Sequence, residues 1–392
     1  MYTQQADLCQ RLLHEHYGPL VEAVGAVLIR EGRLHLGGLL RHTGLAPASL
    51  RQALAVLIQH SLVTHAPTRE GARMVTYYSI SLRSILRLQR AGLYLALVEE
   101  RMGKDGLAVF RAVLLHGCLS IGAARGQLGF GQLGAPAKKK FNIAVAKLVR
   151  ERFIVAVSAQ DAVTKADRVI QAEASEIAKL DAPPTAKDLQ KIRERISLCE
   201  SEEYHSSTIV GLKRGAPQPA ADSNGGAPKV LIGPDGRAII VDGGADGVQD
   251  VAADADAVDD KQCFRVYFDR LDVFLRNKQV VNYFADKYNE AVGVVLKTVL
   301  RLTEAHTRTC RDQMSERVTA NQIMQNIPPD ARLEDAVDMG DSAFMQGAAD
   351  DGDGSSGRAR RGRTAFALLE LLRADASGVV SKADDRGSGV YR

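Results

Sequence analysis

The chain has 392 residues, of which 45% are hydrophobic and 25% charged, a composition that is ordinary for a globular protein of two or three domains. It contains no run of about 20 apolar residues, the length that a membrane-spanning helix needs. Its first residues, MYTQQADLCQRL, lack the basic-then-apolar pattern of a secretory signal. We therefore expect a soluble intracellular protein that has no membrane partner.

The formal net charge of +4 conceals an uneven distribution of charge along the chain. Residues 1–160 contain 20 Lys and Arg against 9 Asp and Glu, so this part carries +11 and the remainder carries −7. A basic amino-terminal part favours a nucleic-acid partner, although net charge informs about association and not about fold.

After a leucine-rich helical segment that starts the chain, residues 32–80 show the order helix, turn, helix and hairpin. A short apolar helix ends at Gly44, a residue that tolerates the left-handed conformation of many helix ends. A second helix, 50–58, repeats apolar residues at i, i+4, i+7 and i+8. Two β-prone runs, 62–65 and 74–80, then flank a turn with a basic tip. This order predicts a winged helix, a fold that binds DNA in some proteins and protein in others.

The same pattern recurs after a linking helix at 82–102. Ser120 is expected to cap a short helix and Pro136 to open a longer one, and 153–157 reads as a strand. The runs ALAVLIQHSLV and AVAKLVRERFIVAV correspond in pattern, which indicates an internal repeat and therefore tandem winged helices. A second wing is poorly defined, because 158–179 is polar and partly helical.

The remainder of the chain alternates between helical segments and segments of low complexity. A charged helix is expected at 185–204, and the Gly, Ala and Asp-rich insert that follows is expected to be disordered apart from a small hairpin in KVLIGPDGRAIIV. A third module follows, with Thr319 as an N-cap and a hairpin at 378–391 that stops before it closes. A second disordered insert near 340–363 ends in RARRGR, which could be a nuclear-import signal or a solubilising loop.

The expected fold is mainly α with small β-wings, built of tandem winged-helix (helix-turn-helix) domains and incomplete at its C-terminal end. The expected divisions are winged helix 1 at 1–81, winged helix 2 with its linking helix at 82–180, the charged helix and insert at 181–262, and winged helix 3 at 263–392.

Motifs of enzymes and of metal sites are absent or lack their context. GFGQLG at 129–134 fits G-x-G-x-x-G, but no strand precedes it, so a loop is expected there and not a nucleotide site. The aspartates at 350–353 lack the calcium-loop register, and the histidines and five scattered cysteines lack ligand spacing. No Walker, G-x-S-x-G or H-E-x-x-H sequence occurs. We expect no cofactor, no metal and no catalytic residues.

Polar and basic side chains on the two modules form the candidate DNA-binding site. Lysines along a helix neutralise phosphates without reading sequence, although a charged helix face can also be simply solvated. The candidates are Ser49, Arg51 and Gln52 on the second helix, Arg69 and Arg73 on the wing, and Lys138, Lys139, Lys140 and Lys147 on the long helix of the second module.

The first 65 or so residues resemble a known family. The segments LCQRLLHEHYG and AVGAVLIREGRLHLGGLLRHTGLAPASLRQALAVLIQHSLV are similar to the first winged helix of the RNA polymerase III subunit often called RPC-three, or C eighty-two in yeasts. The matching features are His16-Tyr17-Gly18, the glycine-containing run from Val24 to Gly32, the turn Thr43-Gly44 and the run from Ala53 to Val63. Weaker similarity continues at FNIAVAKLVRERFI, FRVYFDRLDVFLRNKQVVNYFADKYN and TANQIMQNIP.

The resemblance implies several winged helices and a C-terminal coiled coil, with a relationship to the large subunit of the general factor TFIIE. It implies a non-catalytic nuclear subunit that forms a detachable trimer with two other polymerase III subunits, near the clamp. Such a subunit helps to recruit the enzyme and to melt promoter DNA at tRNA and 5S RNA genes. By comparison with the family pattern, we expect this sequence to lack the fourth winged helix and the coiled coil.

Two other functions agree with the same residues. One is a free-standing dimeric winged-helix regulator that binds an operator, which would leave a palindromic footprint. The other is a protein-interaction scaffold that does not bind DNA even at low salt. Partners recovered from nuclear extract would distinguish a polymerase subunit from both.

Overall fold

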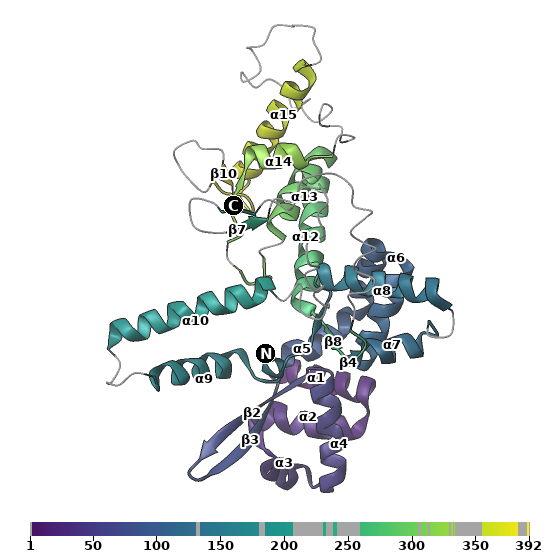
Figure 1. Cartoon of the computed structure of the whole chain (residues 1–392), viewed down its shortest axis with the longest axis vertical. Helices are drawn as coiled ribbons and strands as arrows, with labels where there is room; N and C mark the ends of the chain where they lie inside the picture. Colours follow the sequence, from purple (N-terminus) through teal and green to yellow (C-terminus); the bar gives the residue numbers. More distant parts are fainter. Residues whose placement is uncertain are drawn as a thin grey trace, which may run out of the picture. The chain divides into compact units, whose positions relative to one another are not determined.

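The computed structural model describes residues 2–130, 134–179, 185–206, 230–232, 238–240, 259–304, 307–312, 314–328, 331, 333, 355–382 and 390–391 (Figure 1). The chain divides into two compact units, Met1–Tyr267 and Phe268–Arg392. Within the described residues, none of the helices is long and apolar enough to span a bilayer.

The first module is a winged helix preceded by one additional helix. Gly44 ends α3 with φ 64°, and its backbone N–H donates to the carbonyl of Leu40 at 3.0 Å, so the predicted left-handed helix stop is confirmed. The helix α4 buries one apolar face against α2, and the three strands pair antiparallel in the order β1-β3-β2. Its elements are α1 (Tyr2–Tyr17), α2 (Pro19–Glu31), β1 (Leu34–His35), α3 (Leu36–Thr43), α4 (Pro47–Gln59), β2 (Val63–Glu70) and β3 (Arg73–Ile80).

A kinked helix connects the first module to the second. After α5 (Leu82–Leu86) and a 3-10 turn, η1 (Arg87–Arg90), the helix α6 covers Ala91–His116. Gly103 lies inside α6 with φ 73° and ψ −174°, values that interrupt a helix. The part after Gly103 is the first helix of the second module, as the pattern of apolar residues predicted.

The second module has the same strand order as the first, and this changes the assignment of one segment. Its sheet is β4-β8-β5, so β8 (Cys263–Val266) lies between β4 (Cys118–Ser120) and β5 (Ile154–Ala156). The sequence pattern placed Cys263 at the start of the third module. The pairing instead makes β8 the returning strand of the second wing, the counterpart of β3. The module's other helices are α7 (Ile121–Gln127), whose N-cap is the predicted Ser120, and α8 (Gly134–Arg150).

The second wing is therefore interrupted by a long excursion of the chain, residues 157–262, which we call the insert. Each end is anchored to the second module: the Arg125 guanidinium of α7 binds both carboxylate oxygens of Asp260 at 2.8 and 2.7 Å, and Arg265 of β8 pairs with Asp161 at 2.7 Å. The described parts of the insert are η2 (Ala159–Ala162), α9 (Lys165–Ile177), α10 (Ala186–Ser206), β6 (Val230–Ile232) and β7 (Ala238–Ile240).

Two predictions for the insert are confirmed. The expected charged helix is α10, which lies beside α9 through the ion pairs Arg193–Glu173 at 2.9 Å and Arg195–Glu176 at 3.0 Å. The expected small hairpin is present as the antiparallel pair β6 and β7. The disorder expected for residues 211–260, apart from that hairpin, concerns positions that lie almost entirely outside the described residues.

The second unit contains the third helix-turn-helix. Its helices and strands are α12 (Phe268–Lys287), α13 (Glu290–Glu304), β9 (Val318–Thr319), α14 (Ala320–Asn326), α15 (Ser355–Ala374) and β10 (Val390–Tyr391). The predicted N-cap is confirmed, since Thr319 and Gln322 form a capping box at the start of α14.

Two expectations for this unit are corrected. The hairpin at 378–391 was expected to stay open, but β10 pairs with β9, and Tyr391 forms an antiparallel bridge with Lys382. The basic run RARRGR was assigned to a disordered insert, but α15 begins at Ser355 and includes it. Arg361 of this run donates to the carbonyls of Pro328 and Ala331, each at 3.1 Å, which ties this part of α15 to the chain after α14.

The third helix of each module buries apolar residues at one shared spacing. Four apolar residues at i, i+3, i+4 and i+7 face the core, which is one stripe of a helix. They are Leu50, Ala53, Leu54 and Leu57 in α4, Phe141, Ala144, Val145 and Leu148 in α8, and Ala365, Leu368, Leu369 and Leu372 in α15. The same spacing occurs at Val292, Val295, Leu296 and Val299 of α13, so it marks a helix that packs on a core and does not by itself establish a repeat.

Candidate nucleic-acid interface

The helix α4 presents the predicted polar face to solvent. Arg51 and Gln52 are exposed, and Ser49 is half-buried next to the core residue Leu50. This arrangement follows from the apolar stripe, because residues that flank it on a helix must lie at its edge or opposite to it. A guanidinium and an amide on one exposed helix face are groups that contact phosphates or base edges.

The first wing carries Arg69 and Arg73 near its tip, and both are exposed. In the strand register, Glu70 lies opposite Arg73 across the hairpin. The Arg69 Nε–H donates to the carbonyl of Gly71 at 3.1 Å. The carboxylate of Glu70 accepts a hydrogen bond from the Tyr77 hydroxyl, which raises the pKa of Tyr77. The tip therefore presents two guanidinium groups, while its one acidic side chain is bound to the body of the wing.

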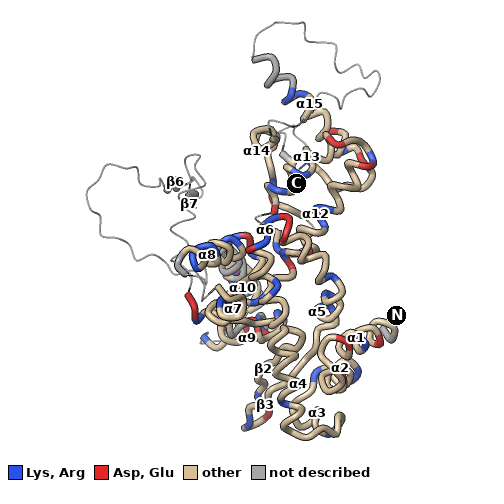
Figure 2. The backbone as a smooth tube through the Cα atoms, turned by 90° about the vertical axis from the view of Figure 1, so that its right-hand side faces the viewer, with Lys and Arg blue, Asp and Glu red and all other residues tan. Residues whose placement is uncertain are grey.

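The helix α8 carries the lysine cluster predicted from the sequence. Lys138, Lys139 and Lys140 are exposed near its start, and Lys147 is exposed further along. Figure 2 shows basic positions in blue along α8. Among the described residues, none of these four lysines forms an ion pair with a carboxylate. Unpaired lysines on one helix keep their full attraction for phosphate groups.

The structure gathers the candidate residues into separate groups. Arg69 and Arg73 share the tip of the β2–β3 hairpin, and the lysine cluster lies on α8 of the other module, apart from that tip in both views (Figures 1 and 2). The candidates therefore form basic surfaces on two modules and not a single continuous site.

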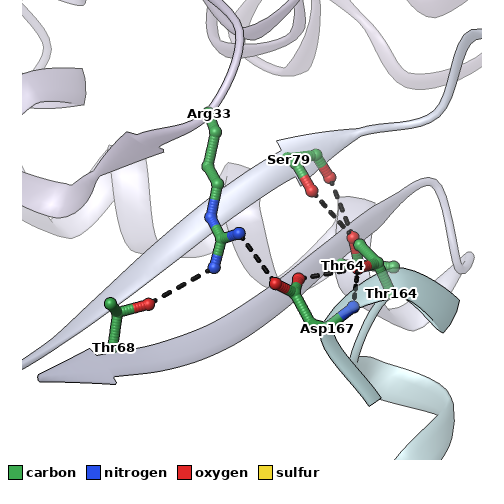
Figure 3. Close-up of polar contacts among 6 residues, drawn as sticks. All are labelled: Arg33, Thr64, Thr68, Ser79, Thr164 and Asp167. Carbon is green, nitrogen blue, oxygen red and sulfur yellow. Dashed lines mark hydrogen bonds and ion pairs between the residues drawn. The ribbon is translucent and has the colours of Figure 1, made fainter. Parts of the chain in front are cut away.

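Sequence reasoning missed the residues that join the first wing to the insert. Arg33 lies between α2 and β1, and its Nη1 binds the Asp167 carboxylate of α9 at 2.9 Å (Figure 3). Its Nη2 donates to the Thr68 hydroxyl of β2 at 3.4 Å, and its guanidinium lies 5.6 Å from the centre of the Tyr77 ring. No pattern in the sequence predicts a pair whose members are 134 positions apart.

Asp167 is held in its charged form by two neighbours. The Thr164 hydroxyl donates to Oδ2 at 2.6 Å, and this bond, followed by the interactions with Arg33, lowers the pKa of Asp167. Thr164 is also the N-cap of α9, because its hydroxyl accepts from the Asp167 backbone N–H at 3.1 Å. The side chains of Arg33 and Asp167 are 39% and 17% exposed, so the ion pair alone contributes about 1 kcal/mol or less.

The guanidinium of Arg125 is buried, and it organises the second module. Besides Asp260, it binds the Asn142 side chain of α8 at 3.1 Å and lies 5.4 Å from the centre of the Phe141 ring. Arg125 therefore serves the structure and is not part of a surface for ligands. In the described part of the chain, no three His, Cys, Asp or Glu side chains come together to hold a metal ion.

Comparison with known families agrees with this architecture. Residues 7–67 match the helix-turn-helix domain of RNA polymerase III subunit RPC82, and residues 144–392 match the RPC82 family itself. The chain belongs to the RPC82 family.

Curated relatives of this RPC82-family chain are named as subunits of the same enzyme, RNA polymerase III. DNA-directed RNA polymerase III subunit RPC3 of Danio rerio is 24% identical over 340 residues, which cover 84% of this chain and 56% of the relative. The subunit of the same name from Aspergillus clavatus is 25% identical over 351 residues, covering 78% and 54% of the two chains. The human subunit is 32% identical over 123 residues, which are 31% of this chain and 22% of the relative.

The RPC82-family chain spans about half the length of the first two relatives. The family is that of an accessory subunit of RNA polymerase III and not of the subunit that carries the catalytic centre. The resemblance noted in the amino-terminal sequence and the mainly helical winged-helix fold are both confirmed.

Proposed function

We propose that this chain acts in the nucleus as a non-catalytic subunit of RNA polymerase III, within an initiation subcomplex of three subunits. Its winged helices bind duplex and melted promoter DNA, and their other faces contact neighbouring subunits. The process that it serves is initiation and promoter opening at tRNA and 5S RNA genes. The residues assigned to DNA are Ser49, Arg51, Gln52, Arg69, Arg73, Lys138, Lys139, Lys140 and Lys147.

The lysine cluster of α8 is the observation that supports DNA binding most directly. Lys138, Lys139 and Lys140 are exposed on consecutive positions, and no described carboxylate neutralises them. Counterion release makes such a cluster bind phosphates with an affinity that falls steeply with salt. The family membership supports the polymerase as the assembly in which this occurs.

Replacing Lys138, Lys139 and Lys140 together by Gln tests the assignment. We expect weaker binding of a duplex of arbitrary sequence, and a salt dependence whose log–log slope falls by roughly 0.9 for each phosphate that is no longer neutralised. Fluorescence anisotropy across a salt series measures both quantities. The matched control is Lys187→Gln/Lys191→Gln/Lys297→Gln, which removes the same charge from exposed positions on other helices.

A slope that is unchanged in the triple variant, or reduced equally in the control, would contradict a DNA role for the α8 cluster. Recovery of other polymerase III subunits with the tagged chain from nuclear extract tests the assembly separately. If those subunits co-purify while no duplex binding occurs even at low salt, the chain is a protein-interaction scaffold.

A further inference from the structure

The insert of the second wing lies against the wing of the first module. The 3-10 turn η2, which begins just after β5, contacts β2. In the sheet order β1-β3-β2, β2 is one of the two edge strands, and the insert lies beside it. The first turn of α9 then brings Asp167 next to Arg33 (Figure 3).

Arg33 is the centre of this contact. Its guanidinium binds Asp167 of the insert and Thr68 of β2, and it lies beside the ring of Tyr77 on β3. One side chain thus contacts both strands of the hairpin and the insert, and a planar fork with several donors is suited to that geometry. Because Tyr77 in turn binds Glu70 near the tip, the contacts continue from the insert toward the end of the wing.

The hairpin transmits this constraint because it is well paired along its length. The register of β2 and β3 is regular from Val63 opposite Ile80 to Glu70 opposite Arg73. The hydroxyls of Thr64 and Ser79 add a cross-strand hydrogen bond of 3.0 Å. An antiparallel ribbon held at its base and along one face has a defined direction at its tip.

We propose that Arg33 and Asp167 are positioning residues for the first wing, so that docking of the insert sets the orientation in which Arg69 and Arg73 are presented. The docking follows from the contacts above. Its effect on a nucleic-acid ligand rests on the proposed function, and the two parts are tested by separate measurements.

Hydrogen exchange of the full chain without any ligand tests the docking. In Arg33→Glu and in Asp167→Asn, we expect backbone amides of β2 and of the first turn of α9 to exchange several-fold faster. Opening of these segments then costs less free energy, because it no longer has to break the ion pair. The double variant Arg33→Glu/Asp167→Arg restores an ion pair and should recover most of the protection. The control Arg30→Glu makes the same change of charge at a nearby exposed arginine and should leave both segments unchanged.

A double-mutant cycle tests the positioning. Arg69→Gln/Arg73→Gln should weaken duplex binding in the parent chain by a measurable factor, and by a much smaller factor when Arg33→Glu is also present. Such non-additivity is expected if a displaced wing no longer delivers its arginines to the ligand. The charge-swapped background should restore the full effect of the wing arginines.

The outcomes separate the two proposals. Unchanged exchange of β2 and α9 in both single variants would overturn the docking. Faster exchange together with an equal effect of the wing arginines in every background would overturn the positioning. If the wing arginines have no effect on binding even in the parent chain, the assignment of the wing to DNA fails. The proposal that docking positions the wing for DNA then fails with it. The exchange data still decide whether the insert docks on the wing.

Discussion

Individual side chains decide where elements begin and which segments are held together. Thr319 starts α14 through a capping box, and Thr164 starts α9 in a similar way. In the second unit, Asp375 follows the end of α15 and accepts hydrogen bonds from the Lys287 ammonium, the Tyr288 hydroxyl and the Ser377 backbone N–H. This carboxylate thereby joins the end of α12 to the end of α15.

Asp375 is expected to make the second unit sensitive to acid. The bonds from Lys287, Ser377 and Tyr288 hold its pKa well below the ordinary value of about 3.9 for aspartate. A carboxyl group whose pKa is lowered by folding stabilises the native state above the unfolded value, and this contribution is lost as pH falls through the folded pKa. We therefore expect Asp375→Asn to lower the melting temperature at pH 7 and to make it fall less between pH 5 and acidic conditions.

Thermal unfolding followed by circular dichroism over a pH series provides the measurement. The control is Asp286→Asn, which removes an exposed carboxylate from α12, the helix that carries the partner Lys287. Parallel pH profiles for the parent chain and Asp375→Asn would show that Asp375 does not contribute to acid sensitivity.

At the scale of elements, the second wing is a hairpin whose connection has been replaced by the insert. The strands β5 and β8 still pair as β2 and β3 do, because the ion pairs Arg125–Asp260 and Arg265–Asp161 hold the ends of the insert beside the sheet. Lengthening a connection costs little closure entropy once its ends are fixed, since that cost grows only with the logarithm of the length.

The central part of the insert should therefore be dispensable for folding. A chain in which 207–258 is replaced by a short Gly-Ser linker is expected to keep its melting temperature within a few degrees, since each doubling of loop length changes the free energy by only about 0.6 kcal/mol. Its strands β6 and β7 pair with each other, and neither pairs with another of the described strands. Differential scanning calorimetry is the measurement, and a large loss of stability would show that the segment is part of a core.

A matched variant tests whether the ends of the insert matter more than its middle. Replacing Arg125 by Met in the shortened chain should lower stability by roughly 1–3 kcal/mol, because Asp260 and Asn142 lose a charged donor. Equal stability with and without Arg125 would contradict its role in closing the second wing.

At the scale of the whole molecule, two winged helices share one compact unit and the third belongs to the other. The first two modules meet where α4 ends and where α6 ends. The Gln59 side chain donates to the carbonyl of His116 at 2.8 Å. Gly117, with φ 72°, lies so close to the end of α4 that a Cβ on it would be 2.6 Å from the Gln59 carbonyl oxygen and 2.8 Å from the His60 Cα.

Gly117→Ala is expected to destabilise this junction by roughly 1–3 kcal/mol, because the left-handed conformation is strained for alanine and the new methyl group meets backbone atoms. Chemical denaturation of the full chain measures the loss. Gly103→Ala separates the two causes, because Gly103 has a similar φ of 73° but no atom within 4 Å of the position that a Cβ would take. If the two variants lose equal stability, the contact between the modules contributes nothing to the effect of Gly117.

The sequence by itself determined the local structure of this protein, because helix stops, caps and apolar spacing act within a few residues. Gly44, Thr319 and the stripe in α4 are examples, and the family pattern in the first 65 or so residues was also readable without a structure. The exposure of Lys138, Lys139 and Lys140 followed from the same spacing, while their binding to DNA stays a prediction.

Only the tertiary structure decided which distant segments meet. A short apolar run such as Cys263–Val266 pairs with whichever edge the fold presents, so its place between β4 and β5 could not be inferred from its own residues. The pair Arg33–Asp167 is hidden for the same reason, since its two ordinary charged residues become partners only after the insert folds back. Strand pairing and ion pairing depend on proximity in space, which the order of residues along the chain does not specify.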